Sequence, residues 1–495
     1  MIIQGICIID QTIRDFCLIT GHAGIDPGKA RRHPDGIFRL DRCIGLGRQN
    51  PDQAFGGVFK SGIFSHTIFQ CQLSTNRSYR DKQIETNVSA HGVNSLQTDD
   101  RIIIAGAGPV GLVAAMLLAE AKIPVTIVEA EDDISDDLRA STFHPPTLDM
   151  LDAYGVTGQL LAEGLTCPTW QIRMHETGDK AVFDMSVLAD VTAHPYRLQC
   201  EQAKLCRIIR DKLVRDGNVD FRFGHRVTGL SQDSDGVTLK LMIGQNQDTV
   251  DMRARYVIAA DGAGSKIRDL LQLEFDGKTY PETTVLASTS FPFHEHLEGL
   301  SNVNYCWSAS GNFSLLRLKG FWRCSLYYNP DLSMEDAASD ERVQGQLRQI
   351  MPGHDRFDII DRRPYRVHQR IIKEYVHGRV LMAGDSAHLN SPSGGMGMNG
   401  GVHDAFNLVE KLTTVWNGAK ADLLDQYTRQ RQPVAYNQIL VQADKNRKRM
   451  AEKDPAKRAE LLKDLQAITS DRDRLYDHLY KSSMFAGLDA AKAIG

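Results

Sequence analysis

The chain has 495 residues, 42% of them hydrophobic and 24% charged, and its formal net charge at pH 7 is −4. This length allows two or three domains with a substantial buried core, so it excludes a single short module. The small negative charge is also unlike that of a nucleic-acid binder or of a protein held at membranes by basic residues.

Cysteine spacing and the first residues indicate the compartment. The nine cysteines include no Cys-x-x-Cys pair, and no histidine cluster has zinc-ligand spacing. This pattern fits buried or free thiols in a reducing environment better than a disulfide framework, and it predicts no metal site. The opening MIIQGICIID has no positively charged leader before its short apolar run, so we expect no secretory signal and a cytoplasmic location.

Residues 1 to about 100 differ in texture from the rest of the chain. Short apolar runs alternate with GHAGIDPGKARRHPDG and QNPDQAFGG, without a sustained helical or strand period. The segment holds Cys7, Cys17, Cys43 and Cys71 and no recognisable motif. We interpret it as a disordered or misassigned extension ahead of the first packed domain.

From Arg101 the pattern changes to strand, helix, strand. Strand RIIIAG is followed by a helix over about 109–121 and by strand PVTIVEA. The stretch 102–119 carries no charge and approaches the length of a membrane span. Its glycines fall where a strand would turn into a helix, which favours a nucleotide-binding unit, so no stable membrane insertion is expected.

The turn between this strand and helix carries a dinucleotide-binding pattern, Gly106-Ala107-Gly108-Pro109-Val110-Gly111. Its first glycine permits the tight turn, the second lets the backbone approach a pyrophosphate, and the third lets the helix pack closely on the strand. The helix N-terminus attracts phosphate charge. Glu129, eighteen residues after the last glycine, is placed to accept hydrogen bonds from ribose hydroxyls. This pattern alone does not distinguish NAD from FAD.

The remaining elements follow in order. An amphipathic helix over about 201–215 precedes the alternating segments FRFGHRVTGL, VTLKLMI and ARYVIAA. The section from about 275 to 370 is β-like and rich in aromatic residues, which suits a sheet forming one wall of a substrate cavity, although a plain core is an equally ordinary explanation. After strand RVLMAGD come a glycine-rich turn, a long helix over about 398–416 and charged C-terminal helices.

Two further motifs follow strands. Asp261-Gly262-Ala263-Gly264-Ser265 comes after ARYVIAA, and Gly384-Asp385-Ser386-Ala387-His388 leads into the loop SPSGGMGMNGG at 391–401. Each motif places an acid at the end of a strand against glycines. A carboxylate there can bind a sugar-like hydroxyl chain, and bare backbone can approach a ligand.

With these three ordered motifs the sequence resembles the flavoprotein aromatic hydroxylases, the family that includes para-hydroxybenzoate, phenol and 3-(3-hydroxyphenyl)propionate hydroxylases. The resemblance covers about 101–440 and is supported by RASTFHPPTLDML and LLDQYTRQRQPVA. It implies an α/β fold in which a Rossmann-like FAD-binding domain, formed by 101–275 and 371–495 with the C-terminal helices, carries an inserted mixed β-sheet substrate domain over 276–370.

The resemblance also implies residue roles. The glycine motif, from Gly106 through Gly108, Pro109 and Val110 to Gly111, and Glu129 would bind the ADP half of FAD. Asp385 beside Gly384 would bind the ribityl chain, and Asp261 with Gly262 would lie near the pyrophosphate and the path of the nicotinamide cofactor. Arg139 and Gln199 match residues that contact FAD, and Gly397 is a further candidate for binding it.

The catalytic candidates are Pro392, Met398 and Asn399. Pro392 matches the residue whose backbone faces the substrate ring. The amides of Met398 and Asn399, at the start of a helix, match those that support the flavin pyrimidine edge.

The activity that the resemblance implies uses FAD with NADH or NADPH and O2. NAD(P)H reduces FAD, O2 adds to the reduced flavin, and the resulting peroxyflavin transfers an OH group to a phenol, an aromatic acid or a hydroxypyridine. A single Gly-x-Gly-x-x-Gly site implies that NAD(P)H binds transiently. His388, next to Asp385, is interpreted as a structural residue that shapes the flavin loop and not as a base. A homodimer is left open.

Substrate contacts are less defined by the sequence. Arg197, Tyr305 and Arg317, with His194, are the candidates, because an arginine suits a carboxylate. Ser386, Ser391 and Met396 depart from common residues of the family, which leaves the substrate preference open. Two alternatives remain: a quinone-pathway ring hydroxylase with a greasier substrate, and an FAD protein that does not hydroxylate. A flavin-dependent halogenase is disfavoured because the sequence has no Trp-x-Trp-x-Ile-Pro segment.

Overall fold

The computed structural model describes residues 30–32, 38–40, 100–244, 248–328 and 331–495. The chain divides into two compact units, Met1–Asn94 and Ser95–Gly495. In the first unit, the short strands β1 (Ala30–Arg32) and β2 (Phe38–Leu40) pair antiparallel. The prediction made for residues 1 to about 100, including its four cysteines, otherwise falls outside the described residues.

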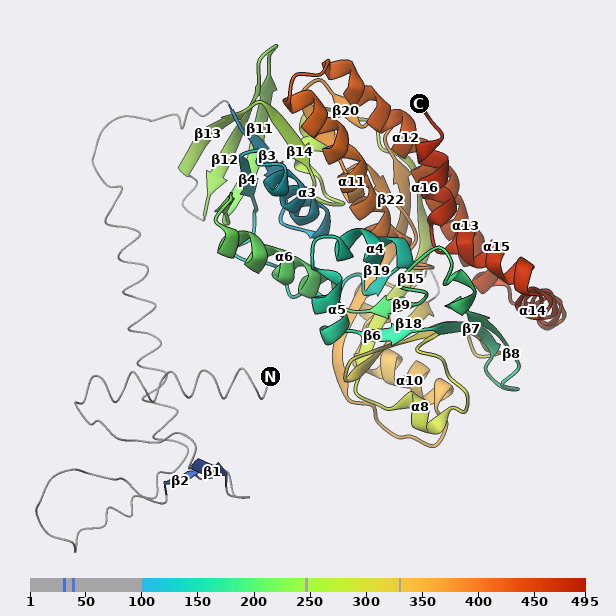
Figure 1. The fold of residues 1–495 in the computed structure, drawn as a ribbon. Coiled ribbons are helices and arrows are strands. Elements are labelled where there is room, and N and C mark those ends of the chain that lie inside the picture. The colour runs from blue at the N-terminus through green and yellow to red at the C-terminus, as the bar shows by residue number, and fades with distance from the viewer. Residues whose placement is uncertain (1–29, 33–37, 41–99, 245–247, 329–330) are drawn as a thin grey trace, which may run out of the picture. The chain divides into compact units, whose positions relative to one another are not determined.

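The second unit contains a six-stranded sheet. Its strands, in spatial order, are β10 (Val219–Arg222), β4 (Val125–Val128), β3 (Ile102–Ala105), β14 (Tyr256–Ala259), β21 (Val380–Met382) and β20 (Val376–His377). Of these, β3, β4, β14 and β20 are labelled in Figure 1. All neighbours pair parallel except β20 and β21. Every residue of β3, β4, β14 and β21 is buried, as expected of parallel strands covered on both faces.

Helix α3 (Pro109–Glu120) explains the long uncharged stretch of the sequence. It is apolar on all sides, and its residues from Val110 to Ala119 are buried. It packs between the sheet and the helices α6 (Gln202–Asp216) and α11 (Met396–Trp416), so apolar side chains are needed on every face. No helix in the described part of the chain is long and apolar enough to span a bilayer.

A second, eight-stranded sheet contains most of the aromatic-rich section. In spatial order its strands are β22 (His388–Leu389), β19 (Ile359–Ile371), β15 (Asp276–Thr289), β18 (Phe321–Tyr328), β17 (Phe313–Leu318), β16 (Val303–Trp307), β7 (Thr169–Met174) and β8 (Lys180–Asp184). The strands β7 and β16 pair parallel and the other neighbours antiparallel. This sheet therefore draws β7 and β8 from a part of the chain well before residue 276.

The two faces of this sheet have different roles. On β18, Trp322, Cys324 and Leu326 pack in a core with helix α10 (Asp340–Ile350), whereas the alternate residues Arg323, Ser325 and Tyr327 line a large cavity. This alternation follows from the two-residue period of a strand. One face of the aromatic section is therefore core and the other borders a cavity, and the binding of a substrate in this cavity stays a prediction.

Smaller elements complete the unit. The segments predicted as a meander between 221 and 260 divide between two sheets. An antiparallel sheet joins β11 (His225–Gln232), β12 (Val237–Ile243) and β13 (Asp248–Ala254), whereas the third predicted segment, ARYVIAA, contains β14 of the six-stranded sheet. A three-stranded sheet joins β5 (Thr142–Phe143), β9 (Arg197–Gln199) and β6 (Leu165–Cys167). The short helices are α4 (Pro145–Asp152), α5 (Thr157–Glu163), α7 (Lys266–Leu270), α8 (Phe293–His296) and α9 (Met334–Ala337).

The C-terminal section is helical, as the charge pattern predicts. Its helices are α12 (Asp425–Val434), α13 (Val441–Ala451), α14 (Pro455–Thr469), α15 (Arg472–Ser482) and α16 (Phe485–Lys492). A π-helical turn over Ala435–Leu440 joins α12 to α13. The mixed α/β class is thus confirmed. The five cysteines in the described residues, Cys167, Cys200, Cys206, Cys306 and Cys324, are buried free thiols, and burial raises the pKa of each one.

Candidate active site

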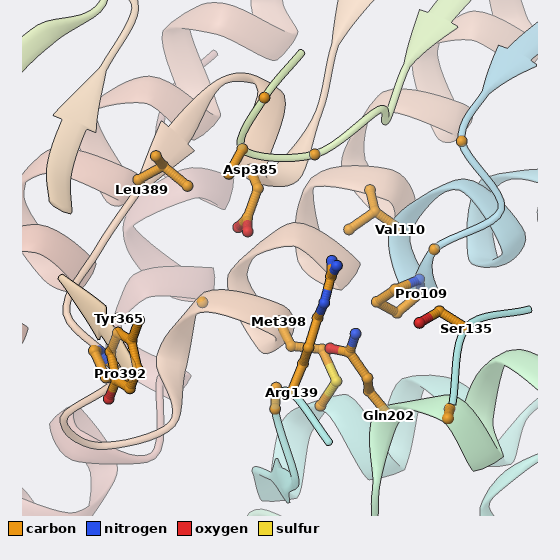
Figure 2. Close-up of a pocket in the computed structure, with 18 of the residues that line it drawn as sticks. Pro109, Val110, Ser135, Arg139, Gln202, Tyr365, Asp385, Leu389, Pro392 and Met398 are labelled. Atoms are coloured by element: carbon orange, nitrogen blue, oxygen red, sulfur yellow. The ribbon is translucent and has the colours of Figure 1, made fainter. Parts of the chain in front are cut away.

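A cavity of about 850 Å³ lies between the carboxyl ends of the parallel strands and the inner face of the eight-stranded sheet. All three sequence motifs contribute to its lining. Figure 2 shows side chains of the first and third motifs, among them Pro109 and Asp385, around the same space. The predicted site residues that line it are Gly106, Gly108, Pro109, Val110, Glu129, Arg139, Asp261, Gly262, Tyr305, Asp385, Pro392, Gly397 and Met398. The motifs, separated by more than a hundred residues, thus meet in one site.

The glycines of the first motif serve two different purposes. At Gly106 (φ +105°) a Cβ atom would lie 2.3 Å from the carbonyl oxygen of Ala260, and at Gly111 it would lie 2.0 Å from that of Gly106. These two glycines are required by packing. A Cβ atom on Gly108 would meet no protein atom within 4 Å, and φ there is an ordinary −74°. Since the protein itself does not require this glycine, the space beside it fits a ligand that approaches the backbone at the start of α3.

The acidic residues of the three motifs, Glu129, Asp261 and Asp385, differ in whether protein groups donate hydrogen bonds to their carboxylates. Glu129 accepts hydrogen bonds from the backbone N–H of Ala107 (2.7 Å) and of Glu131 (3.0 Å). Asp261 accepts from Ser265 Oγ (2.6 Å) and from the backbone N–H of Ile267 (3.1 Å). Both carboxylates therefore stabilise the backbone turns next to them. Burial raises the pKa of Asp261.

Asp385 is the acid that faces the cavity without a partner. Its carboxylate points into the open space (Figure 2), and among the described residues no group donates a hydrogen bond to it. The surrounding protein raises the pKa of this carboxyl group by desolvation. An acceptor held in this way suits the hydroxyl groups of a polyol chain.

The N-terminus of α11 forms another side of the cavity. Gly395, in the left-handed conformation (φ +69°), donates its backbone N–H to Pro392 O (2.9 Å). The next three amides belong to the first helical turn, where the helix offers no acceptor, and Gly397 and Met398 line the cavity. The helix start therefore presents free donors and a positive end to any bound group.

Asn399 does not line the cavity, and its side chain is engaged elsewhere. Its Oδ1 accepts from His144 N (2.9 Å), and its Nδ2 donates to Thr142 O (2.8 Å) and to Gly395 O (2.6 Å). The residue therefore fastens the strand β5 to the start of α11. The expected contact of Asn399 with the flavin through its amide stays a prediction.

Arg139 extends into the cavity beside Pro109 and Gln202 (Figure 2). Arg323 of β18 binds the loop that carries Arg139. This arginine is buried, and the sequence analysis did not select it. Arg323 donates to the carbonyl oxygens of Leu138 and Arg139 and to Ser141 Oγ (3.1 Å). The eight-stranded sheet thus fixes the loop that carries Arg139.

Replacing Arg323 with methionine removes this anchor while keeping a side chain of similar length. We expect the dissociation constant of FAD to rise about tenfold, the effect of losing a charged hydrogen bond that preorganises the loop. Titration of the apoprotein with FAD, followed by flavin fluorescence, measures it. Arg362→Met on β19, where Arg362 makes a partly exposed ion pair with Asp340 (3.3 Å), is the matched control. Equal affinities of the two variants would contradict the anchoring role.

Gln199 lies away from the cavity, so its expected contact with FAD stays a prediction. Its side chain is fully buried and exchanges hydrogen bonds with the Thr142 hydroxyl (2.9 and 3.2 Å), away from the cavity lining. Gln202, in the first turn of α6, lines the cavity instead (Figure 2). The sequence contained a usable signal, because Gln202, Ala203 and Cys206 have helical spacing and share the face that borders the cavity.

Other candidates also lie outside the lining of the large cavity. Gly111 and Gly384 pack beneath it, and Val110 lies 2.8 Å from the Cβ position of Gly384. Arg317 contacts His294 (2.8 Å) and His194 contacts Asp149 (2.6 Å), so neither is placed to meet a substrate there. His388 is buried and paired with Asp404 (2.7 Å), which agrees with a structural role.

The inner end of the cavity contains tyrosines that the sequence analysis did not select as site residues. Tyr327 and Tyr365 line it together with Tyr305. Burial raises the pKa of Tyr365 to about 12, so this phenol keeps its proton at neutral pH. Tyr327 is 37% exposed. On β18, Tyr327 lies on the same face as Arg323 and Ser325, which also line the cavity.

Comparison with known proteins agrees with this geometry. The family model described as FAD binding domain matches residues 99–442. Over 370 residues, the chain is 36% identical to para-nitrophenol 4-monooxygenase from Pseudomonas sp. (strain WBC-3), covering 73% of this chain and 90% of that protein. The chain belongs to the family of FAD-dependent aromatic hydroxylases. As a member, this hydroxylase is an FAD-dependent monooxygenase, and the family implies NAD(P)H as the reductant.

Two further relatives extend the comparison. The hydroxylase is 31% identical over 382 residues to 6-hydroxy-3-succinoylpyridine 3-monooxygenase of Pseudomonas putida, covering 77% of this chain and 96% of that one. The crystal structure of p-nitrophenol 4-monooxygenase from Pseudomonas putida matches with a TM-score of 0.74 and 33% identity, covering 80% of this chain and 99% of that chain. The catalytic unit is therefore similar to these proteins over nearly their whole length.

Proposed function

We propose that this hydroxylase acts on a small phenol or hydroxypyridine held between the flavin and the inner face of the eight-stranded sheet. One oxygen atom of O2 enters the ring in place of hydrogen, the other becomes water, and NAD(P)H is oxidised to NAD(P)+. The observation that carries the proposal is the single cavity that joins the three FAD motifs to the tyrosine-lined face. The relatives named for nitrophenol and hydroxypyridine oxygenation support the substrate class.

The residues of the cavity fit FAD in a defined order. Glu129 and the backbone at Gly108 would hold the ADP half, Arg139 and Gln202 the middle of the molecule, and Asp385 the ribityl chain. When bound, FAD supplies the chemistry of electron transfer and O2 activation. The amides at Gly397 and Met398 would stabilise negative charge on the ring system, since they lie at the positive end of α11.

The protein's own groups would orient the ring and limit water access. Pro392 lines the cavity, and its backbone would face the substrate ring. The phenols of Tyr327 and Tyr365 are placed to donate hydrogen bonds to a substrate oxygen, favouring its phenolate form. Tyrosine, serine and arginine side chains at this end suit a compact polar ring better than a prenylated one.

The domain assignment follows from this arrangement. The section 276–370, together with β7 and β8, would be the substrate-binding domain, and the sections 101–275 and 371–495 would otherwise form the FAD-binding domain. The presence of strands from before residue 276 in the same sheet supports a substrate domain with that earlier contribution. The homodimer and the cytoplasmic location stay predictions.

The testing experiment uses the purified full chain. Its visible spectrum reports bound FAD, and NADH or NADPH oxidation and O2 uptake are then followed across phenols, aromatic acids and hydroxypyridines. We expect one class to accelerate oxidation and to yield a product heavier by one oxygen atom. Bound FAD without acceleration by any compound would overturn the hydroxylation, and activity confined to prenylated phenols would assign the quinone-pathway alternative.

A further inference from the structure

A second, small cavity of about 20 Å³ opens beside the large one. Tyr305 and Ser393 line both, so the two spaces adjoin at the end of the site next to Pro392. The other polar groups around the small cavity include Arg197, Arg449, Asn446 and His478. A space of this size holds a water molecule or the polar end of a ring substituent, and not a second ring.

Arg197 is a buried cation without a counter-charge. Only 3% of the residue is exposed, and its guanidinium carbon lies 4.7 Å from the centre of the Trp170 ring. Its Nε has no hydrogen-bond acceptor, and within the described residues no carboxylate oxygen lies within 4.0 Å of it. Desolvation lowers its pKa, and the main group that favours the charged form is the hydroxyl of Tyr305. Buried arginines are ordinarily paired, so the site lacks an anion.

Arg449 adds a second cation to the same cavity. One terminal nitrogen donates to Asn446 Oδ1 (3.0 Å), while its Nε has no acceptor. No carboxylate in the described part of the chain pairs with Arg449 either, and the hydroxyl of Tyr305 is again its favourable electrostatic neighbour. His478 does not supply a negative charge: burial and the two arginines lower its pKa to about 4, so it is neutral.

The placement of Arg449 depends on an irregular backbone. The π-helical turn over Ala435–Leu440 follows Pro433 and shifts the face that α13 presents. Gln442, Asn446 and Arg449, at helical spacings of four and three, then line the small cavity together. A regular helix through this segment would turn these three side chains elsewhere.

We propose that this small cavity is a subsite for a planar, negatively charged two-oxygen substituent on the aromatic substrate, held by Arg197 and Arg449. A carboxylate and the nitro group of a nitrophenolate share this chemistry. The flat fork of an arginine matches such a group, and its negative charge offsets part of the positive charge of the two arginines when it binds. The inference rests on the proposed function and specifies its substrate class. The sequence analysis singled out Arg197 and Tyr305 but not Arg449.

The test compares three ligands of similar shape: 4-nitrophenol, 4-hydroxybenzoate and 4-methylphenol. Dissociation constants come from the change in the visible flavin spectrum of the holoenzyme, and KM comes from NAD(P)H oxidation. The variants are Arg197→Met and Arg449→Met, which keep side-chain length and remove charge. Arg317→Met is the matched control, because Arg317 lines neither cavity.

We expect the wild type to bind at least one oxygen-bearing ligand more tightly than 4-methylphenol. Each of the two variants should weaken that binding about 10- to 100-fold while leaving 4-methylphenol within about twofold. Arg317→Met should change neither. Preference for 4-nitrophenol alone identifies the nitro group, and preference for 4-hydroxybenzoate alone identifies the carboxylate.

Two results would overturn the subsite: wild-type protein that binds 4-methylphenol as tightly as both other ligands, or variants that weaken all three ligands equally. If Arg197→Met fails to hold FAD, Arg449→Met carries the same test from a different element. Failure of the proposed function is distinct, since it would appear as ligand binding without stimulated NAD(P)H oxidation in the wild type.

Discussion

Replacing Gly108 with aspartate is expected to abolish FAD binding without unfolding the protein. The new Cβ atom would point into open space, with no protein atom within 4 Å, so the folded chain has room for it. Gly108 is also the N-cap of α3, a position where aspartate and asparagine are strongly preferred. The apoprotein should therefore be as stable as the wild type or more stable.

The loss of FAD would come from shape and charge together. The side chain would occupy the approach to the helix N-terminus, and its carboxylate would repel a pyrophosphate held there. Gly108→Asn separates the two effects, because it adds the same bulk without the charge. We expect the dissociation constant of FAD to rise about 100-fold for asparagine and further for aspartate, as in other cases of overfilled sites.

The measurement combines FAD titration of the apoprotein with its thermal unfolding. Gly158→Asp is the control: Gly158 is exposed in the first turn of α5, and its Cβ position is also open. That variant should bind FAD normally. Full FAD occupancy of Gly108→Asp would show that no phosphate group approaches this backbone. Gly106→Ala, by contrast, should destabilise the fold itself, since φ there is +105° and Ala260 O lies at 2.3 Å.

The predictable part of this site was the part encoded by local spacing. Gly106, Gly108, Glu129 and Asp385, whose contacts with FAD stay predictions, meet at one cavity because each follows a buried strand within a few residues, and parallel strands bring their carboxyl ends to one edge. The periodicities also located α3 and α6 to within one or two residues. Sequence spacing is enough to predict a site residue when its position depends on residues close to it along the chain.

The parts that were missed depend on contacts between distant segments. Arg449 reaches the small cavity only because a π-helical turn changes the face that α13 presents. The hydrophobic periodicity of the sequence does not predict such a turn. The pairing of β7 with β16 joins residues about 130 positions apart, so the full extent of the sheet was not visible. Gln199 and Gln202 are three residues apart, and only the exit of β9 into α6 decides which one faces the cavity.

A buried ion-pair network of Asp404, Arg431 and His388 lies next to the motif that contains Asp385, and its loss is expected to destabilise the fold strongly. Asp404 on α11 is fully buried and accepts hydrogen bonds from Arg431 Nε (2.7 Å) and from the backbone N–H of Gly384 (3.2 Å). Its Oδ2 also lies 2.7 Å from His388 Nε2. The carboxylate of Asp404 therefore connects α11 to α12 and to Gly384, the residue just before Asp385.

Asp404→Asn would leave the buried Arg431 without its counter-charge. Breaking one partner of a buried ion pair destabilises proteins by about 3–5 kcal/mol, so we expect a loss of that order in the free energy of unfolding. Urea unfolding, followed by tryptophan fluorescence, measures it. Asp464→Asn on α14 is the control, because Asp464 is exposed and makes no ion pair in the described part of the chain; its effect should stay within about 0.5 kcal/mol.

The same carboxylate predicts a pH dependence. Burial alone would raise the pKa of Asp404, but the charges of Arg431 and His388 outweigh it and lower the pKa to about 2. An unfolded aspartate titrates near about 3.9, so the folded state binds this proton less readily than the unfolded state. The stabilisation is therefore complete above about pH 4 and is lost as the pH falls through about 2. Wild-type stability should fall more steeply than that of Asp404→Asn across this window, and parallel pH profiles of the two proteins would show that Asp404 does not carry the charge that stabilises the loop.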